Sequence, residues 1–243
     1  MKLKQVTLTG ADDSIESAKL FDITEKYPFV EWAILLSKKQ MGGKRFPSAA
    51  WMRKLNGEIK VYSEQIDFAG HLCGSWLDNL MLVGDISFIH DIPMWSHFKR
   101  IQLNFHAEPR VLSEQAIEAM RTLCWDQGKQ FVVQMDGVNN HIYEELLNAG
   151  IIAWGLYDTS HGAGVLPEEW PEEIPSIGKH IYRGYAGGLG EDCLEAELIK
   201  LEQAVEGDVV WVDMETKLRS AFDVQFDLDK CTGCLELCKK YTA

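Results

Sequence analysis

Asp158 is the only carboxylate in the run "IIAWGLYDT", where it ends an apolar segment and stands directly before a glycine-broken loop, "SHGAGV". A carboxyl group fixed at the mouth of a folded core suits general acid catalysis, because it can hold a proton within reach of a substrate. Aspartate is also common where a strand simply turns into a loop. The residues that surround Asp158 decide between these two interpretations.

Other polar side chains recur two positions apart within apolar segments, and such positions share one face of a strand. Buried polar groups need partners, so they bond to one another or bind a ligand. Mutual hydrogen bonding explains any single pair, but the set as a whole favours a polar ligand pocket. The set consists of Thr7 with Thr9, His71 with Cys73, Gln102 with Asn104 and His106, and Gln134 with Asp136.

Some of these residue types also suit zinc, namely those of His71, Cys73, His106 and Asp136. Nothing in their spacing is diagnostic, so neither a metal nor another cofactor is predicted. The cysteines of the tail segment "CTGCLELC" fall on one face of a predicted helix, where a thiol packs as a small hydrophobe.

The segment "YAGGLGED", from Tyr185 to Asp192, is a candidate anion site. Gly187 and Gly188 directly follow an apolar run, and glycine lets the backbone approach a ligand closely. The helical pattern that begins just beyond offers free N–H groups and the positive end of its dipole. An ordinary glycine turn is the simpler alternative.

Strand-like and helical segments alternate along the whole chain, which predicts a parallel sheet built from right-handed crossover units. Eight such units in 243 residues match a (β/α)8 TIM barrel, so we predict an α/β fold with one barrel domain, residues 1–243. An open doubly wound sheet is the alternative, but its Gly-rich fingerprint is missing after the first strand. The predicted strands are 5–10, 30–37, 66–74, 99–107, 129–137, 151–159, 180–188 and 208–216, and the predicted helices are 14–27, 48–57, 75–84, 112–128, 139–150, 167–174, 191–207 and 228–241.

Composition narrows the classes of function. The formal charge of −13 disfavours surface-wide binding to nucleic acid or to an anionic membrane, because such binding uses many Lys and Arg side chains. No segment approaches the roughly 18 consecutive apolar residues of a membrane span, and the N-terminus lacks an apolar secretion signal. We therefore expect a cytoplasmic protein with reduced cysteines and a small-molecule ligand.

Several segments together resemble the phosphoribosylanthranilate isomerase family, a TIM barrel of tryptophan biosynthesis. They follow the family's order and cover nearly the whole chain: "VTLTGADD", "AILLSKKQMGGKRFPS", "RIQLNFHAEP", "GLYDTSHGAG" and "YAGGLGED". The family converts an aminoaldose to an aminoketose with a cysteine general base and an aspartate general acid. The resemblance implies that Asp158 is the acid, that Arg45 contacts the anthranilate carboxylate, and that the Gly187 and Gly188 backbone binds phosphate.

The general base departs from the family pattern. Thr9 stands where the family has its cysteine, and a threonine hydroxyl is a very weak base at neutral pH. Asp13, His71 and Asp136 are the candidates to replace it.

The end of the eighth strand departs as well, because Asp213 and Glu215 stand where the family has a Gly-rich phosphate loop. Carboxylates repel a phosphate dianion. Either Lys217 and Arg219 compensate, or a neutral or aminated sugar-like ligand binds there. The remaining polar strand residues are expected to complete the ligand-binding wall: Asn104, His106 and Gln134.

These observations predict an acid/base isomerase or related enzyme that acts on a small sugar-like or phosphorylated metabolite. Asp158 would protonate a ring oxygen, and Arg45 would hold an acidic group. Two alternatives stay open. One is a phosphoribosylanthranilate isomerase with an altered base, and the other is a catalytically silent barrel that binds a ligand or a protein.

Overall fold

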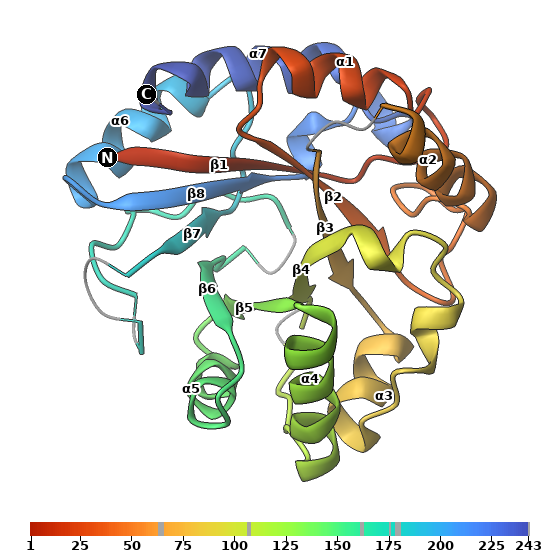
Figure 1. Ribbon diagram of the computed structural model, residues 1–243. Helices are drawn as coiled ribbons and strands as arrows, with labels where there is room; N and C mark the ends of the chain where they lie inside the picture. Colours follow the sequence, from red (N-terminus) through yellow and green to blue (C-terminus); the bar gives the residue numbers. More distant parts are fainter. Residues whose placement is uncertain (63–65, 106–107, 161–162, 175, 178–180, 243) are drawn as a thin grey trace.

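Eight parallel strands close into a barrel in the order of the sequence, β1 to β8 (Figure 1). The computed structural model describes residues 1–62, 66–105, 108–160, 163–174, 176–177 and 181–242. The predicted (β/α)8 architecture is thereby confirmed. The strands are β1 Lys2–Thr9, β2 Val30–Leu36, β3 Asp67–Leu72, β4 Phe98–Leu103, β5 Gln130–Met135, β6 Ala153–Tyr157, β7 Arg183–Ala186 and β8 Val209–Met214.

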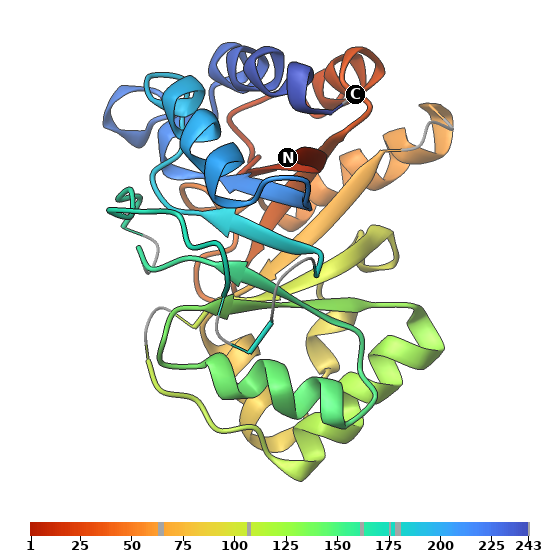
Figure 2. The same ribbon diagram turned by 90° about the vertical axis from the view of Figure 1, so that its left-hand side faces the viewer.

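Helices cover the outside of the barrel, and Figure 2 shows them on the outer side of the strands. None of the described helices is long and apolar enough to cross a membrane. The N-terminus and the C-terminus lie on the same side of the molecule, near α7 (Figure 1). The helices are α1 Lys19–Lys26, α2 Ala49–Tyr62, α3 Ser75–Val83, α4 Glu114–Gln127, α5 Asn140–Asn148, α6 Leu194–Ala204 and α7 Leu228–Cys238, with short 3-10 turns at Ser87–His90, Trp95–His97, Thr216–Leu218, Ala221–Asp223 and Lys239–Tyr241.

The helix predicted at 167–174, between β6 and β7, is wrong. The structure has irregular backbone there, because Pro167 and Pro171 each lack the N–H that a helix interior uses. Apolar side chains of this irregular segment pack against the barrel, as the apolar face of a helix would. Trp170 packs edge-on against Tyr185 with ring centroids 5.9 Å apart, and Ile174 is fully buried.

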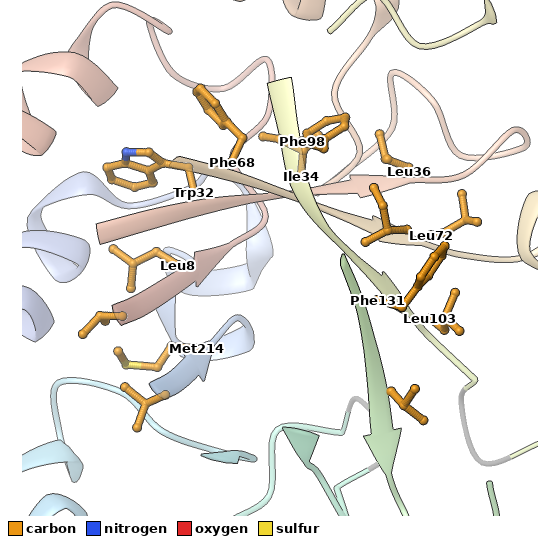
Figure 3. Packing of buried hydrophobic residues seen from close by; sticks show 14 of the residues in the cluster. Leu8, Trp32, Ile34, Leu36, Phe68, Leu72, Phe98, Leu103, Phe131 and Met214 are labelled. Carbon is orange, nitrogen blue, oxygen red and sulfur yellow. The ribbon is translucent and has the colours of Figure 1, made fainter. Parts of the chain in front are cut away.

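The outward faces of the strands form the main hydrophobic core with the helices. Figure 3 shows this packing around β2, where Trp32, Ile34 and Leu36 alternate with residues of the inner face. Phe68 and Phe98 of the next two strands continue it. The alternation therefore directs the neighbouring residues of β2, among them Glu31, into the barrel.

The barrel interior divides into an apolar part and a polar part. A separate cluster fills the side of β5 to β8, where Val132, Leu156 and Ala186 surround the indole of Trp211. On the side of β1 to β4, Glu31 and Arg100 form a buried ion pair. Leu156 and Ala186 of the apolar part reach the pocket at the strand ends, whereas Glu31 and Arg100 lie outside the pocket lining.

Gly184 is required for the apolar part of this interior. A Cβ at this position would lie 2.2 Å from Cε2 of Trp211 and 2.6 Å from Cδ1 of Leu156, so neighbouring side chains would have to move. Gly184→Ala is expected to lower the free energy of unfolding by about 1–3 kcal/mol, measured by urea denaturation.

Gly57→Ala is the matched control, because this exposed glycine of α2 has no atom within 4 Å of an added Cβ. Alanine should stabilise the chain there by roughly 0.5–1 kcal/mol. A Gly184→Ala chain as stable as the parent would contradict the packing described.

Candidate active site

A cavity of about 260 Å³ opens where the strands end at their C-terminal side. It gathers residues that lie far apart in the sequence. The predicted site residues on its wall are Arg45, His71, Asn104, Gln134, Asp158, Gly187, Gly188, Asp213 and Glu215. A barrel places strand ends together in this way, so the pocket holds the polar side chains that the strand alternation singled out.

Asp158 is buried in the pocket wall and is held by three donors. The Gln134 amide donates from Nε2 to Asp158 Oδ2 over 3.1 Å, while the backbone N–H and the hydroxyl of Ser160 donate to Oδ1 over 3.1 and 2.7 Å. The amide of Gln134 is itself oriented, because the Phe105 N–H donates to its Oε1 over 2.9 Å. The partners of Asp158 suit an ionised carboxylate, which only accepts hydrogen bonds.

Asp213 lies beside Thr9, the residue at the family's cysteine position. The Thr9 hydroxyl donates to Asp213 Oδ1 over 2.7 Å, so its proton is directed at the carboxyl and away from a substrate. Burial raises the pKa of Asp213 well above its usual 3.8, and the negative charges of Glu215 and Glu31 add to the rise. Thr9 and the Arg100 charge act in the opposite direction. Asp213 is therefore a pocket carboxyl group that keeps its proton to a higher pH than an exposed aspartate does.

His71 is a neutral neighbour of Asp213. Its Nε2 lies 3.6 Å from Asp213 Oδ2, which is too long for a hydrogen bond. Burial, helped by the charge of Arg100, lowers the pKa of His71 to about 3. Within the described part of the chain, His71 Nδ1 has no hydrogen-bond partner. A neutral, buried imidazole next to a protonated carboxyl adds no charge to the pocket.

Arg45 is held by carboxylates of the chain itself. Its guanidinium donates to Glu215 Oε1 over 2.9 Å and to Asp223 Oδ2 over 3.1 Å, and its backbone N–H donates to Asp12 over 2.9 Å. Although burial acts to lower it, the charges of Glu215 and Asp223 together raise the pKa of Arg45. The backbone at Arg45 is left-handed, with φ of 69°. Arg45 is thus fixed in place and compensated in charge.

Gly187 and Gly188 bring backbone to the pocket wall after β7. Both have positive φ, 116° and 64°, and a Cβ on Gly188 would lie 2.6 Å from the N of Leu166. Among the described residues, their N–H groups make no backbone hydrogen bond outside the regular helices and strands. Lys217 lines the same part of the pocket and pairs with Asp192 at 3.0 Å. A cation and close backbone N–H groups therefore meet here.

Asn104 is the middle member of a row of three hydrogen-bonded side chains on the pocket wall. Gln102 donates from Nε2 to Asn104 Oδ1 over 2.7 Å, and Asn104 donates from Nδ2 to the sulfur of Cys73 over 3.4 Å. Burial raises the pKa of Cys73 to about 12, so this thiol stays protonated. The predicted ligand-binding residue His106 lies outside the described residues.

Two candidate bases, Asp13 and Asp136, do not line the pocket. Asp13 is exposed and accepts hydrogen bonds from the backbone and the hydroxyl of Ser48, immediately before α2. Asp136 accepts from the N–H groups of Val138 and Asn139 immediately before α5. Both carboxylates satisfy the free N–H groups where a helix begins.

Sequence reasoning missed Ser160, whose hydroxyl and backbone fix Asp158. Its position two residues after an aspartate, in a turn, is a usable pattern, because aspartate oxygens commonly accept from the N–H two residues on. It also missed the buried pair of Glu31 and Arg100. As to metals, no group of three or more His, Cys, Asp or Glu in the described part of the chain is arranged to hold one.

No family model matches the sequence, and no curated protein matches it. Solved structures do match. Phosphoribosylanthranilate isomerases from Thermus thermophilus and Thermotoga maritima are similar with TM-scores of 0.58 and 0.54, at 11% and 15% identity, over 97% of this chain and 98% of theirs. An Escherichia coli aldolase is similar with a TM-score of 0.53 at 9% identity, over 98% of this chain and 89% of its own.

The shared feature is the barrel. Identities of 9–15% show a common fold, and an aldolase that scores close to the isomerases means that the fold alone does not select an activity. The isomerase family indicated by the sequence segments does stand among the structural neighbours, at nearly full coverage of both chains. Function has to be argued from the pocket.

Asp213 gives the stability of the chain a pH dependence. Because its pKa in the folded chain lies above the usual 3.8, the folded state keeps a proton that the unfolded state loses, and the free energy of unfolding falls as the pH rises above about 4. Asp213→Asn removes this loss. Relative to the parent, the variant should gain up to about 1.4 kcal/mol per pH unit until the folded pKa is passed, measured by urea denaturation.

Asp85→Asn is the control of opposite sign. The backbone N–H of Ser87 lowers the pKa of Asp85, so this carboxylate stabilises the fold above its unfolded pKa, and its replacement should cost more stability as the pH rises. If Asp213→Asn follows the pH dependence of the parent, Asp213 is not protonated in the folded chain.

Proposed function

We propose that the chain is an enzyme that moves protons between the carbon and oxygen atoms of a small polar metabolite, as an isomerase does. One observation supports this most: two carboxyl groups line a single pocket in different environments. Asp158 accepts three hydrogen bonds, whereas Asp213 accepts one from Thr9 and lies buried near the negative charges of Glu215 and Glu31. Environments that separate two titratable groups in this way define an acid and a base.

Asp213 is the acid in this proposal, because burial raises its pKa well above the usual range and it keeps a proton that an exposed aspartate would lose. It gives that proton to a carbonyl or ring oxygen of the substrate. Asp158 is the base, since its fixed carboxylate takes the proton from the neighbouring carbon. The enediol so formed becomes product when Asp158, now protonated, gives its proton to the former carbonyl carbon. The Asp213 carboxylate takes the proton from the hydroxyl oxygen on the neighbouring carbon, which becomes the new carbonyl, and both carboxyl groups regain their starting states.

The family resemblance implies that Asp158 is the general acid, whereas Asp158 is the general base in this proposal. The family's cysteine position carries Thr9, whose hydroxyl proton is committed to Asp213. The acid function accordingly moves to the strand beside Thr9, since β8 neighbours β1 in the barrel. The base is then Asp158, which directly follows β6.

Two parts of the pocket wall differ in the ligand groups that they suit. Gly187, Gly188 and Lys217 offer backbone N–H groups and a cation, a combination that suits a phosphate. Arg45 already faces Glu215 and Asp223, so a substrate carboxylate would have to displace them. Hydroxyl groups or an amine fit beside Arg45 better than a carboxylate does.

The test is deuterium exchange from D2O into the carbon next to the carbonyl, followed by proton NMR over a panel of aldose and ketose phosphates, neutral sugars and aminosugars. Exchange reports proton abstraction even when turnover is slow. Asp158→Asn and Asp213→Asn should each lower the exchange rate of the best substrate by about 10²- to 10⁴-fold, because each removes one proton-transfer group.

Asp136→Asn is the matched control, since this carboxyl group caps α5 and lies outside the pocket lining. It should leave the exchange rate essentially unchanged. Exchange that persists at the parent rate in both pocket variants would refute the assignment. Absence of exchange with the whole panel would favour the silent, ligand-binding barrel.

The family's own reaction is a separate arm of this test, motivated by the structural neighbours. Purified protein is offered the phosphoribosyl anthranilate aminoaldose, and the gene is introduced into a tryptophan auxotroph that lacks the isomerase. Because Arg45 already pairs with Glu215 and Asp223, we expect turnover of this substrate to be absent or very slow. Rapid turnover would restore the family activity and contradict the substrate preference proposed above.

A further inference from the structure

The barrel holds a second polar layer directly beneath Asp213. Thr7 is the register partner of Glu31 on β2 and of Asp213 on β8, so it joins the two layers. Arg100 is the register partner of Ala69, two residues before His71 on the same strand face. The lower layer of Thr7, Glu31 and Arg100 therefore underlies both Asp213 and His71.

The residues of the lower layer are buried and are hydrogen-bonded to one another. Arg100 donates from Nε to Glu31 Oε1 over 2.9 Å and from its terminal nitrogen to Glu31 Oε2, and Thr7 donates to Glu31 over 2.8 Å. The guanidinium also lies 4.6 Å from the ring centroid of Trp211. Arg100 is 6% and Glu31 1% exposed, so water screens neither charge strongly.

The charges of Arg100 and Glu31 influence the two titratable groups that lie above them, Asp213 and His71. Arg100 acts with burial to lower the pKa of His71, and it opposes the rise in the pKa of Asp213. Glu31 has the reverse effect on Asp213. The titratable or charged groups that act on or lie beside Asp213 from the described elements around it are Glu31, His71, Arg100 and Glu215, while Tyr182 lies near Arg100 and Glu31.

Some polar atoms in the layer and beside it lack hydrogen-bond partners. Within the described residues, Arg100 NH1, the Tyr182 hydroxyl and His71 Nδ1 are buried without hydrogen-bond partners. A buried donor or acceptor without a partner costs free energy, typically about 1–3 kcal/mol. A barrel interior filled with branched apolar side chains would avoid this cost. The ion pair is thus maintained at the expense of stability, which is characteristic of residues that serve function.

We propose that Glu31 and Arg100 are positioning residues whose opposed charges set the pH at which Asp213 loses its proton, and that Arg100 helps to keep His71 neutral. Neither residue lines the pocket, so both act through the groups above them. The inference rests on the proposed role of Asp213, but its test reads the proton directly and needs no substrate.

The experiment is an NMR titration of the protein labelled with carboxyl-13C aspartate and ring-15N histidine. Asp213→Asn identifies the Asp213 resonance by its loss. In the parent chain, His71 should stay neutral from about pH 5 to 8, while Asp213 titrates above its usual range. Protonation of His71 above about pH 6 in the parent would overturn the proposal without any variant of the pair.

Single variants of Glu31 and Arg100 should then shift the titration midpoint of Asp213 in opposite directions. Glu31→Gln leaves the Arg100 charge uncompensated and should lower the midpoint of Asp213 by about one pH unit. Arg100→Gln should raise that midpoint by about one unit and should raise the midpoint of His71. The double variant carries no unpaired charge, and its Asp213 midpoint should lie between those of the two single variants.

Asp208→Asn controls for the loss of a buried ion pair in general, because Asp208 pairs with Arg183 at 2.8 Å and that pair does not enter the charges acting on Asp213. It should leave the Asp213 midpoint unchanged. Equal Asp213 midpoints in the parent, in the folded single variants and in the double variant would overturn the proposal. Failure of the proposed function alone would instead show as normal titration shifts without any substrate exchange.

Discussion

The structure depends on the exclusion of water from the interior of the closed barrel. Closure directs every second side chain of eight strands inward, and a polar group placed there loses its hydration. Each one therefore has to find a partner, change its protonation state or bear a cost. Glu31 forms an ion pair with Arg100. Burial raises the pKa of Asp213, which favours its protonated form, and lowers the pKa of His71, which favours its neutral form. The chemistry available at the pocket follows from these three responses.

The same constraint accounts for the contacts at the mouth of this barrel. The buried hydroxyl of Thr9 needs an acceptor, and Asp213 of the adjoining strand supplies one. The carboxylate of Glu215 likewise engages Arg45 and reduces its attraction for a substrate anion. The barrel is shared with solved isomerases, and a shared fold is compatible with a different site.

Much of this arrangement could be predicted from the sequence. The alternation in "RIQLNF" and "QFVVQM" places Gln102, Asn104 and Gln134 on inner faces, and the barrel brings those faces together. Asp13 and Asp136 were harder, since a carboxylate just past a strand either faces the pocket or caps the next helix, and only the local turn decides.

Charged residues inside the strands were the largest omission. The face that includes Gln102 and Asn104 also includes Arg100, yet a single arginine in a strand normally points to solvent, and its partner Glu31 stands 69 residues away. Such a pair is visible only when the register is known. The segment 167–174 failed for a local reason, because its two prolines outweigh its helical pattern.

The position of the proton is the central claim, and neutron crystallography of the deuterated protein near neutral pH measures it directly. The account predicts a deuteron on the Asp213 oxygen that does not accept from Thr9, none on Asp158, and a single deuterated nitrogen on His71. A bare Asp213 beside a doubly deuterated His71 would contradict it, and with it the assignment of acid and base.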